Sequence, residues 1–386
     1  MATTSMPLNK IDPRQRAWVE VSPDAIKANT LAIRSLLDEQ CLLMAVVKAD
    51  GYGHGSETVA EAALAGGATN LGVATLQEAL ELRKAGIVCP ILVLGNLINP
   101  EDLDACIHWD LMPTLSSARE ALLCNQIAES HDKEFCVHIK VDTGMTRLGC
   151  DLRLASELIQ LVDNLKNLSL RGIYSHLALA DVEANGQANS FTSKQKEKFE
   201  TLLSSVMPRG KPLYRHLANS AGTLRDKGLH FDMVRVGLAL YGYSPLKDLR
   251  NNFSLQPALA VRAKVTLLRD VPSDTGVSYG HTFITQRPSR LAVVGIGYAD
   301  GISRALSGKM SVLIDGKFYP QVGSITMDQL VIDITESPQI QIGSVVTLLG
   351  VDGDSAITPY DWSEISGSIP WEILCSFKYR LPRVVI

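Results

Sequence analysis

Short apolar runs alternate with amphipathic segments along the first two thirds of the chain. The runs are apolar at nearly every position, which is typical of parallel strands that are covered on both faces. The intervening segments place apolar residues at helical spacing, and one of them opens with Ser22 and Pro23, residue types suited to an N-cap and a first helical turn. The apolar runs lie at residues 42–48, 71–75, 91–95, 111–115, 136–142, 170–176, 213–219 and 232–238.

Eight buried parallel strands separated by helices predict an α/β fold, a (β/α)₈ barrel over residues 17–250. An open, doubly wound sheet is the alternative architecture for the same pattern. After Tyr243 the helical periodicity gives way to short strand-like runs, and Asp315-Gly316 between two of them predicts a type I′ hairpin. We therefore expect a second, mostly β C-terminal domain over residues 251–386.

Composition narrows the classes of partner and compartment. The formal net charge is −4 and the sequence has no lysine or arginine cluster of the kind that follows a phosphate backbone, so a nucleic-acid partner is not expected. The cysteines show no CxxC spacing and the histidines no HxH or HExxH spacing, so neither a metal site nor a disulfide framework is predicted. Residues 1–16 contain no apolar signal region, and the longest apolar stretch, CPILVLGNLI, is too short to span a bilayer. We expect a cytoplasmic protein without a membrane partner.

The first apolar run ends in a lysine that is followed by closely spaced glycines, in the sequence VVKADGYGHG. In a barrel, Lys48 would lie at the carboxyl end of its strand, where barrel enzymes have their active sites. Partial burial there would lower the pKa of its amine, as a lysine that forms imines requires. The alternative is a solvated lysine without a chemical role. The order of lysine and glycines does not match a P-loop.

Further polar residues follow the later strands, at the same predicted end of the barrel. Arg147 follows the fifth run, His176 ends the sixth, and Ser220 follows the seventh. Ser220 and the backbone amides around Gly237 are neutral donors suited to a phosphate in the loops after strands seven and eight. Each residue also has a structural interpretation: Ser220 as a helix N-cap, His176 as a core histidine, and Arg235 in an ion pair.

These residues lie in motifs that resemble those of the alanine racemase family. AVVKADGYGHG is similar to the family's pyridoxal-phosphate attachment motif, and the resemblance extends in the family's order from about residue 15 to residue 383. It implies an isomerase, dependent on pyridoxal 5′-phosphate, that interconverts L-alanine and D-alanine and supplies D-alanine for peptidoglycan. The further matching motifs are KVDTGMTRLG, SHLALAD, HLANSAG, DMVRVGLALYG, VSYGHTF, GYADG, GSITMDQ and YRLPR.

The resemblance implies roles for individual residues around the cofactor. Lys48 would bind it covalently, and His176 would lie near its ring. Arg235 would face the pyridine nitrogen and leave it unprotonated, because an arginine does not readily give up its proton. That arrangement favours simple return of a proton to the substrate over side reactions. The residues implied at the cofactor phosphate are Tyr52, Ser220, Gly237 and Leu238.

The implied mechanism uses two bases on opposite faces of the substrate. Lys48 would serve one face and Tyr279 the other, so that Cα inverts without the substrate turning over. In the family this tyrosine comes from the partner subunit, which implies a homodimer with shared active sites. Arg147 and the backbone of Met327 would hold the substrate carboxylate. Lys140 matches a lysine that is carbamylated in some members and then orients the arginine that corresponds to Arg147.

One position departs from the family's pattern. The family usually has a tyrosine, whose hydroxyl reaches the cofactor phosphate, where this chain has Trp371. The indole N–H only donates and its ring is larger, so we expect the cofactor to bind with altered phosphate contacts. The alternative is that Trp371 packs at the site entrance.

Two other functions fit the sequence. The first is a racemase of the same fold that acts on serine or on a broad range of amino acids. The second, from a different class, is a pyridoxal-phosphate-binding homeostasis protein without racemase activity. Such proteins resemble the barrel alone, so the complete second domain with Tyr279 favours a racemase.

Overall fold

The computed structural model describes residues 12, 14–182, 190–206 and 213–386 and forms two compact units. The barrel unit comprises Pro23–Gly51 and Gly55–Gln256. The β unit comprises the residues up to Ser22, Tyr52–His54 and Pro257–Ile386. Most of the N-terminal segment on which the expectation about a signal region rests lies outside the described residues.

Eight parallel strands form the core of the barrel unit, in the sheet order β10-β2-β3-β4-β5-β6-β8-β9. Hydrogen bonds from Asp232 N to Arg215 O and from Arg235 N to Ala218 O, each 3.0 Å long, join the two ends of this series. The predicted (β/α)₈ barrel is confirmed, and the doubly wound alternative is wrong because an open sheet would keep two free edges. The strands are β2 (Leu42–Val46), β3 (Asn70–Val73), β4 (Ile91–Asn96), β5 (Met112–Leu115), β6 (Phe135–Asp142), β8 (Leu168–Tyr174), β9 (Tyr214–His216) and β10 (Met233–Val236).

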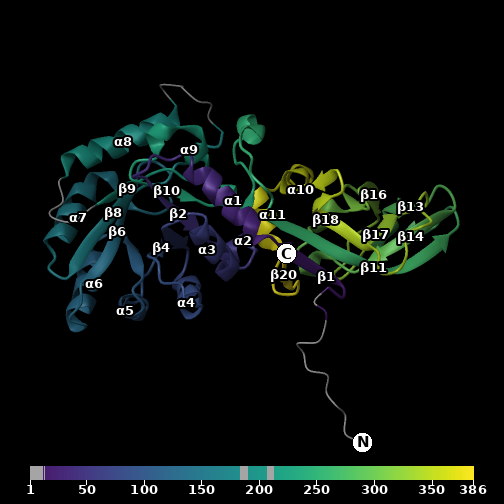
Figure 1. Cartoon of the computed structure of the whole chain (residues 1–386), viewed down its shortest axis with the longest axis horizontal. Coiled ribbons are helices and arrows are strands. Elements are labelled where there is room, and N and C mark those ends of the chain that lie inside the picture. The colour runs from purple at the N-terminus through teal and green to yellow at the C-terminus, as the bar shows by residue number, and fades with distance from the viewer. Residues whose placement is uncertain (1–11, 13, 183–189, 207–212) are drawn as a thin grey trace, which may run out of the picture. The chain divides into compact units, whose positions relative to one another are not determined.

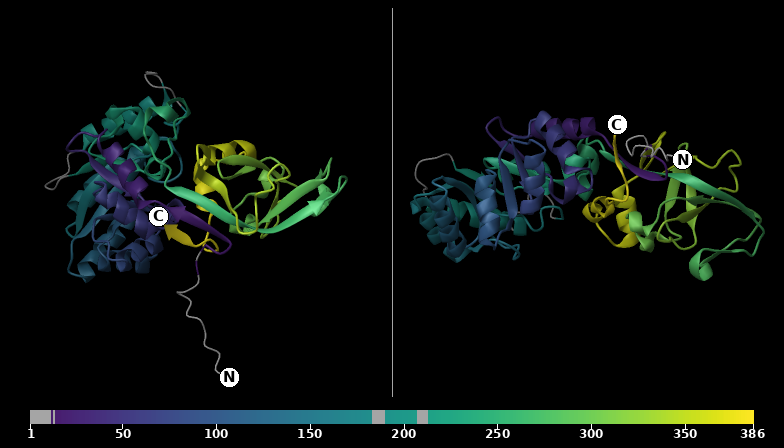
Figure 2. Two further views of the ribbon diagram at one scale, coloured as in Figure 1. Left: turned by 45° about the vertical axis from the view of Figure 1, so that its right-hand side comes forward. Right: turned by 90° about the horizontal axis from the view of Figure 1, so that it is seen from below.

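Helices cover the outside of these strands (Figures 1 and 2), and several of them begin at a side-chain cap. Thr75 and Ser117 each accept a hydrogen bond from the backbone of the third helical residue and complete a capping box with Glu78 and Glu120. The first helix begins at Pro23, as predicted. The helices are α1 (Pro23–Arg34), α3 (Ser56–Ala65), α4 (Leu76–Lys84), α5 (Pro100–His108), α6 (Ala118–Ser130), α7 (Leu152–Asn164), α8 (Phe191–Ser205) and α9 (Ser220–Arg225).

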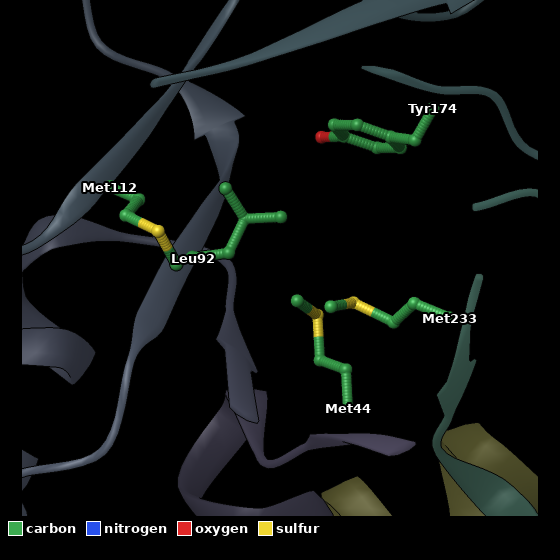
Figure 3. Close-up of a cluster of buried hydrophobic side chains, with 5 residues drawn as sticks. All are labelled: Met44, Leu92, Met112, Tyr174 and Met233. Carbon is green, nitrogen blue, oxygen red and sulfur yellow. The ribbon is translucent and has the colours of Figure 1, made fainter. Parts of the chain in front are cut away.

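Apolar side chains and one tyrosine pack together in the interior of the barrel. Five buried residues from five different strands point toward one another in Figure 3: Met44, Leu92, Met112, Tyr174 and Met233. Inward-facing layers of this kind are the normal core of a (β/α)₈ barrel. Any site in this unit therefore lies at the strand ends and in the loops that follow them.

The β unit contains a mainly antiparallel sheet in the order β19-β18-β15-β16-β17-β14-β11-β1-β20, with an additional pairing of β18 with β11. That pairing closes six of the strands into a ring around the core of this unit. The elements are β1 (Ala17–Val21), β11 (Leu259–Val271), β14 (Ser289–Val294), β15 (Ser311–Ile314), β16 (Lys317–Val322), β17 (Leu330–Asp333), β18 (Val345–Asp352), β19 (Ser355–Ile357), β20 (Arg383–Val385), α10 (Pro359–Ser366) and α11 (Pro370–Ser376).

The first strand of the chain differs from the expectation. Residues 17–21 were assigned to the start of the barrel, but β1 pairs antiparallel with β11, with Val19 opposite Val261, and parallel with β20. The strand is buried at four of its five positions. An apolar run shows that a strand is covered, but it does not show which sheet covers it.

The hairpin between β15 and β16 has the predicted turn. Ile314 pairs with Lys317, so Asp315 and Gly316 form a two-residue loop. Their φ angles are 51° and 75°, and positive values at both positions define the type I′ turn. Within the described part of the chain, no helix is long and apolar enough to cross a membrane.

Candidate active site

Lys48 stands at the start of an unusual left-handed turn after β2. Ala49, Asp50 and Gly51 have φ/ψ angles of 52°/50°, 54°/49° and 58°/44°, and Tyr52 also has a positive φ of 52°. Only one of these four residues is a glycine, and left-handed backbone costs other L-residues roughly 1–2 kcal/mol each. Strain of this kind persists only where the surroundings fix it, and it is concentrated at functional sites.

The glycines of this segment serve the fold of the backbone. A Cβ at Gly53, whose φ is 81°, would lie 2.4 Å from the Leu374 carbonyl oxygen, so only glycine fits against that part of the β unit. Gly51 is equally restricted by Val59 on α3. Gly51 and Gly53 thus each have a structural reason of their own.

A group of basic side chains lies around the carboxyl ends of the barrel strands. Lys140 on β6 is buried, and its pKa is lowered to about 8 by burial and by the positive charges of Arg235, Arg147 and Lys48. Asp142 acts in the opposite direction but more weakly. Among the residues the structure describes, no carboxylate pairs with Lys140 or Arg235, so the group carries an excess of positive charge. It is suited to an anionic ligand.

Arg235 on β10 is buried and donates only to neutral acceptors. Its guanidinium donates to the carbonyl oxygens of Ser175 at 2.7 Å, of His216 at 3.0 Å and of Leu217 at 3.3 Å. Two further contacts join it to the Nδ1 atoms of His216 at 3.1 Å and His176 at 3.2 Å. The expected alternative of an ion pair is wrong for the described residues. Burial lowers the pKa of Arg235 to about 10, and it is still a cation at neutral pH.

These contacts determine where the histidines carry their protons. Since a guanidinium cannot accept a hydrogen bond, Nδ1 of His176 and of His216 must both be unprotonated. The His216 proton is therefore on Nε2, which donates to His138 Nδ1 at 3.0 Å. Burial and the charge of Arg235 lower the pKa of all three imidazoles, that of His138 to about 3. The histidines are neutral donors and acceptors in a chain that starts at Arg235.

Tyr174 is a site residue that the sequence did not reveal. Its ring stacks on His216 with 4.7 Å between centroids, and the Arg235 guanidinium lies 5.0 Å and the Lys140 amine 5.5 Å from the ring centroid. Cations near an aromatic face are stabilised by its quadrupole. His138 was missed as well, although it stands two positions before Lys140 and so shares its side of β6. Alternate residues of a strand point to the same face, so the spacing of two between His138 and Lys140 could have indicated His138 from the sequence.

Ser220 lies close to the Gly237–Leu238 segment, with the Gly237 amide engaged by Ser220 itself, and the role of these three residues at a phosphate stays a prediction. The Ser220 Oγ accepts hydrogen bonds from Gly237 N at 2.9 Å and from Ala239 N at 3.5 Å, which leaves its hydroxyl proton for another acceptor. Leu238 begins the short 3₁₀ turn Leu238–Tyr241. The alternative interpretation of Ser220 as an N-cap is wrong, because Asn219 caps α9 by accepting from Gly222 N.

The β unit carries Tyr279 and Met327 on two ordered loops. Ser278 Oγ donates to Ser324 O at 2.7 Å and Ser324 Oγ donates to Tyr279 O at 2.8 Å, so the tyrosine backbone is held although the residue is 73% exposed. Met327 O accepts from Ala299 N at 3.0 Å. Gly297 permits this contact, since a Cβ there would lie 2.3 Å from Thr326 O.

Tyr52 and Trp371 also belong to the β unit. Tyr52 is buried, and burial followed by the nearby Cys375 raises the pKa of its phenol. Trp371 is half-buried near the start of α11, one helical turn before Cys375. The roles of Tyr52 and Trp371 at a phosphate stay predictions. Among the described residues, no group of three or more histidine, cysteine or acidic side chains is arranged to hold a metal ion.

The donor set of the barrel unit fits a phosphate-bearing aromatic cofactor attached to a lysine. It combines the amine of Lys48, a hydroxyl with adjacent backbone amides at Ser220, and the buried cation Arg235. The fold and these residues together indicate the class of the protein. It is a two-domain (β/α)₈ barrel protein whose strand ends are suited to a lysine-linked, phosphate-bearing cofactor.

Comparisons with known proteins identify the family. The chain belongs to the alanine racemase family: the alanine racemase N-terminal domain matches residues 21–245, and the C-terminal domain matches residues 258–385. The alanine racemase of Nostoc sp. is 49% identical over 373 residues, which is 96% of each chain.

Solved structures agree with this assignment. The crystal structure of alanine racemase from the D-cycloserine producer Streptomyces lavendulae superposes with a TM-score of 0.90 at 35% identity, covering 96% of this chain and 97% of that one. Alanine racemase from Bartonella henselae with covalently bound pyridoxal phosphate has a TM-score of 0.85 at 30% identity, covering 96% and 99%. The family depends on pyridoxal phosphate.

Proposed function

We propose that the protein interconverts L-alanine and D-alanine with pyridoxal 5′-phosphate, in the cytoplasm, and so supplies D-alanine for peptidoglycan. Racemisation of alanine is the activity of the family to which the chain belongs. The observation that carries the proposal at the level of residues is the buried Arg235 on β10, which donates to neutral acceptors and whose strand pairs with the strand leading into Lys48. Both residues belong to the barrel unit.

Lys48, Ser220, Gly237 and Leu238 would hold the cofactor, Lys48 through its amine and the others at the phosphate. When bound, pyridoxal phosphate acidifies the α-hydrogen of an attached amino acid. Arg235 would face the pyridine nitrogen as a donor. Its position is fixed by five acceptors, and none of them can take its proton. The Arg235 guanidinium would thus leave the nitrogen unprotonated, which would favour return of the proton to Cα.

Lys48 and Tyr279 would move the two protons of the reaction. The Lys48 amine, released when substrate binds, would take or return a proton on one face of Cα. The tyrosine side chain would do so on the other face, as phenolate when it takes the proton and as phenol when it returns one. Tyr279 is 73% exposed as a residue in the single chain, as expected for a group that completes another subunit's site. We propose a homodimer in which the partner's Tyr279 serves the barrel that holds Lys48. His176, whose Nε2 carries the proton, would orient that phenol.

Arg147 and the Met327 amide would bind the substrate carboxylate. Lys140 would support Arg147 after carbamylation, a modification that requires a neutral amine. Because the pKa of Lys140 is lowered to about 8, a fraction of its amine is neutral at neutral pH. A carbamate would place a negative charge among the cations Lys48, Arg147 and Arg235, and would hold the Arg147 guanidinium toward the substrate. Trp371 would donate its indole N–H in place of the family's tyrosine hydroxyl.

The assay that tests this function offers L-alanine, L-serine and L-lysine to the purified protein and measures the D-enantiomer of each. Absorbance of the cofactor is recorded before and after borohydride reduction, and the reduced protein is digested to locate the modified residue. We expect turnover of alanine well above that of serine and lysine, with the modification on Lys48. Faster turnover of serine or lysine would favour the broader racemase, and absence of a reducible chromophore would exclude the cofactor.

A further inference from the structure

The left-handed turn after Lys48 needs an external restraint. Its first residue is Ala49, which is not a glycine and has a φ of 52°. Within the turn, Gly51 N donates to Val47 O at 2.9 Å and Gly55 N donates to Asp50 O at 2.9 Å. Neither bond holds the peptide that joins Lys48 to Ala49. The conformation of that peptide sets the direction in which the Lys48 side chain leaves the backbone.

Glu78 holds this peptide from the neighbouring βα unit. Its Oε1 accepts from Ala49 N at 2.7 Å. Its other oxygen, Oε2, accepts from Ala74 N at 2.7 Å and Thr75 N at 3.2 Å and completes the capping box of α4. One carboxylate oxygen is enough for the cap, so the bond to Ala49 is additional to the needs of the helix. A hydrogen bond from an amide to an ionised carboxylate is about twice as strong as a neutral one.

Glu120 shows what the same cap does without a link to Lys48. It occupies the equivalent position in α6, and its Oε2 accepts from Ser116 N at 2.5 Å and Ser117 N at 3.0 Å. Its Oε1 accepts from the Asn96 side-chain nitrogen at 3.3 Å. The two glutamates therefore share one capping geometry and differ in the partner of the second oxygen. In Glu78 that partner is the backbone next to the lysine.

We propose that Glu78 is a positioning residue for Lys48: it fixes the first residue of the left-handed turn and so aims the lysine amine at the cofactor and at Cα. The proposal rests on the proposed function of Lys48. It extends that function to a residue on α4, which belongs to a different βα unit. Glu78 itself touches neither substrate nor cofactor in this scheme.

Glu78→Gln and Glu120→Gln form a matched pair for testing it. A glutamine has one side-chain acceptor, which can still serve the cap in both helices. At position 78 its amide N–H₂ would then face Ala49 N–H, donor against donor. At position 120 the N–H₂ can donate to the Asn96 side-chain oxygen, which has no hydrogen-bond partner among the described residues. The two substitutions therefore weaken the two helix caps to the same extent. Only Glu78→Gln also removes the hydrogen bond that holds Ala49 N.

Three measurements compare the variants with the wild type. Hydrogen exchange of the peptide covering residues 47–55 reports on the turn. The rate at which pyridoxal phosphate attaches to apoprotein, trapped by borohydride and read by mass, reports on the Lys48 amine. Steady-state kinetics with alanine give kcat and KM separately. For Glu78→Gln we expect exchange about tenfold faster, attachment and kcat about tenfold lower, and KM within about twofold. For Glu120→Gln we expect the exchange rate, the attachment rate, kcat and KM each to stay within about twofold of the wild-type value.

Equal effects of the two substitutions would overturn the proposal and leave Glu78 with a capping role alone. A Glu78→Gln change in KM without a change in kcat or exchange would also overturn it. If Glu78→Gln does not fold, Glu78→Asp gives the same test, because its shorter side chain cannot reach both the cap and Ala49. Hydrogen exchange needs neither cofactor nor activity. If the wild-type protein were inactive, the proposed function would be refuted, but the exchange rates of the two variants could still be compared.

Discussion

The side chain of Arg235 makes five hydrogen bonds, and each acceptor is a backbone carbonyl or an imidazole nitrogen. The sequence indicated Arg235, His176 and Ser220 because they lie in apolar runs or just after them, at one end of a barrel. It did not indicate His138 on β6 or Tyr174 on β8. Their contacts depend on how neighbouring strands pair, and linear spacing does not contain that information.

Replacing Arg235 by lysine removes donors from this buried network. A single ammonium group cannot reach the carbonyls of Ser175, His216 and Leu217 together, so at least one buried acceptor loses its partner. We expect the Arg235→Lys protein to lose about 3 kcal/mol of unfolding free energy, measured by urea denaturation. The exposed Arg119 on α6 is the control, and Arg119→Lys should change stability by less than about 0.5 kcal/mol. Equal losses would contradict the network's importance.

Lys140 gives a dependence of stability on pH. Its pKa is about 8 in the fold, against 10.5 for an ordinary lysine, so the unfolded chain binds more protons between these values and stability rises with pH there. Below pH 8 the charged Lys140 disfavours folding. Lys140→Met should therefore be more stable than wild type at pH 7, and the difference should shrink between pH 8 and 10.5. The measurement is denaturant unfolding of both proteins in carbonate-free buffer. A difference in unfolding free energy that does not change with pH would contradict the lowered pKa of Lys140.

At the scale of elements, the apolar runs predicted the eight barrel strands, but several runs extend past the strand ends. The run at 170–176 includes Ser175 and His176, whereas β8 ends at Tyr174. Residues just after a parallel strand can be buried because they line the site, and not only because they pack in the core. An apolar run can therefore continue beyond the last residue of the strand. β1 was placed wrongly, because its partners β11 and β20 are distant in sequence. The type I′ turn was predictable because it depends on two adjacent residues.

Gly297 tests whether the Met327 loop contributes to substrate binding. A methyl group at position 297 would overlap the backbone of residues 326 and 327 and displace the loop. We expect Gly297→Ala to raise KM for alanine about tenfold or more through loss of the Met327 amide, with a smaller effect on attachment of the cofactor. Gly343→Ala is the matched control. It has a φ of 91° and no atom within 4 Å, so it should cost about 1 kcal/mol of stability and leave KM unchanged. A similar KM in both variants would contradict a role for the loop.

At the scale of the whole molecule, the residues of the proposed mechanism are divided between the two units. Lys48, His176 and Arg235 belong to the barrel unit, whereas Tyr279 and Met327 belong to the β unit. The composition and spacing of the sequence do not assign residues to subunits. The motif resemblance implied the homodimer, and the exposed side chain of Tyr279 supports it.

Mixing two inactive variants tests the central claim of a two-base site shared between subunits. Lys48→Ala and Tyr279→Phe proteins are each assayed alone for alanine racemisation, then dissociated, mixed in equal amounts and reassociated. If the two bases come from different subunits, half of the dimers are mixed and each of these has one intact site, which predicts about a quarter of wild-type activity from two inactive proteins. No recovery after mixing, with mixed dimers verified by mass, would contradict the shared site. Full activity of Tyr279→Phe alone would contradict the second base.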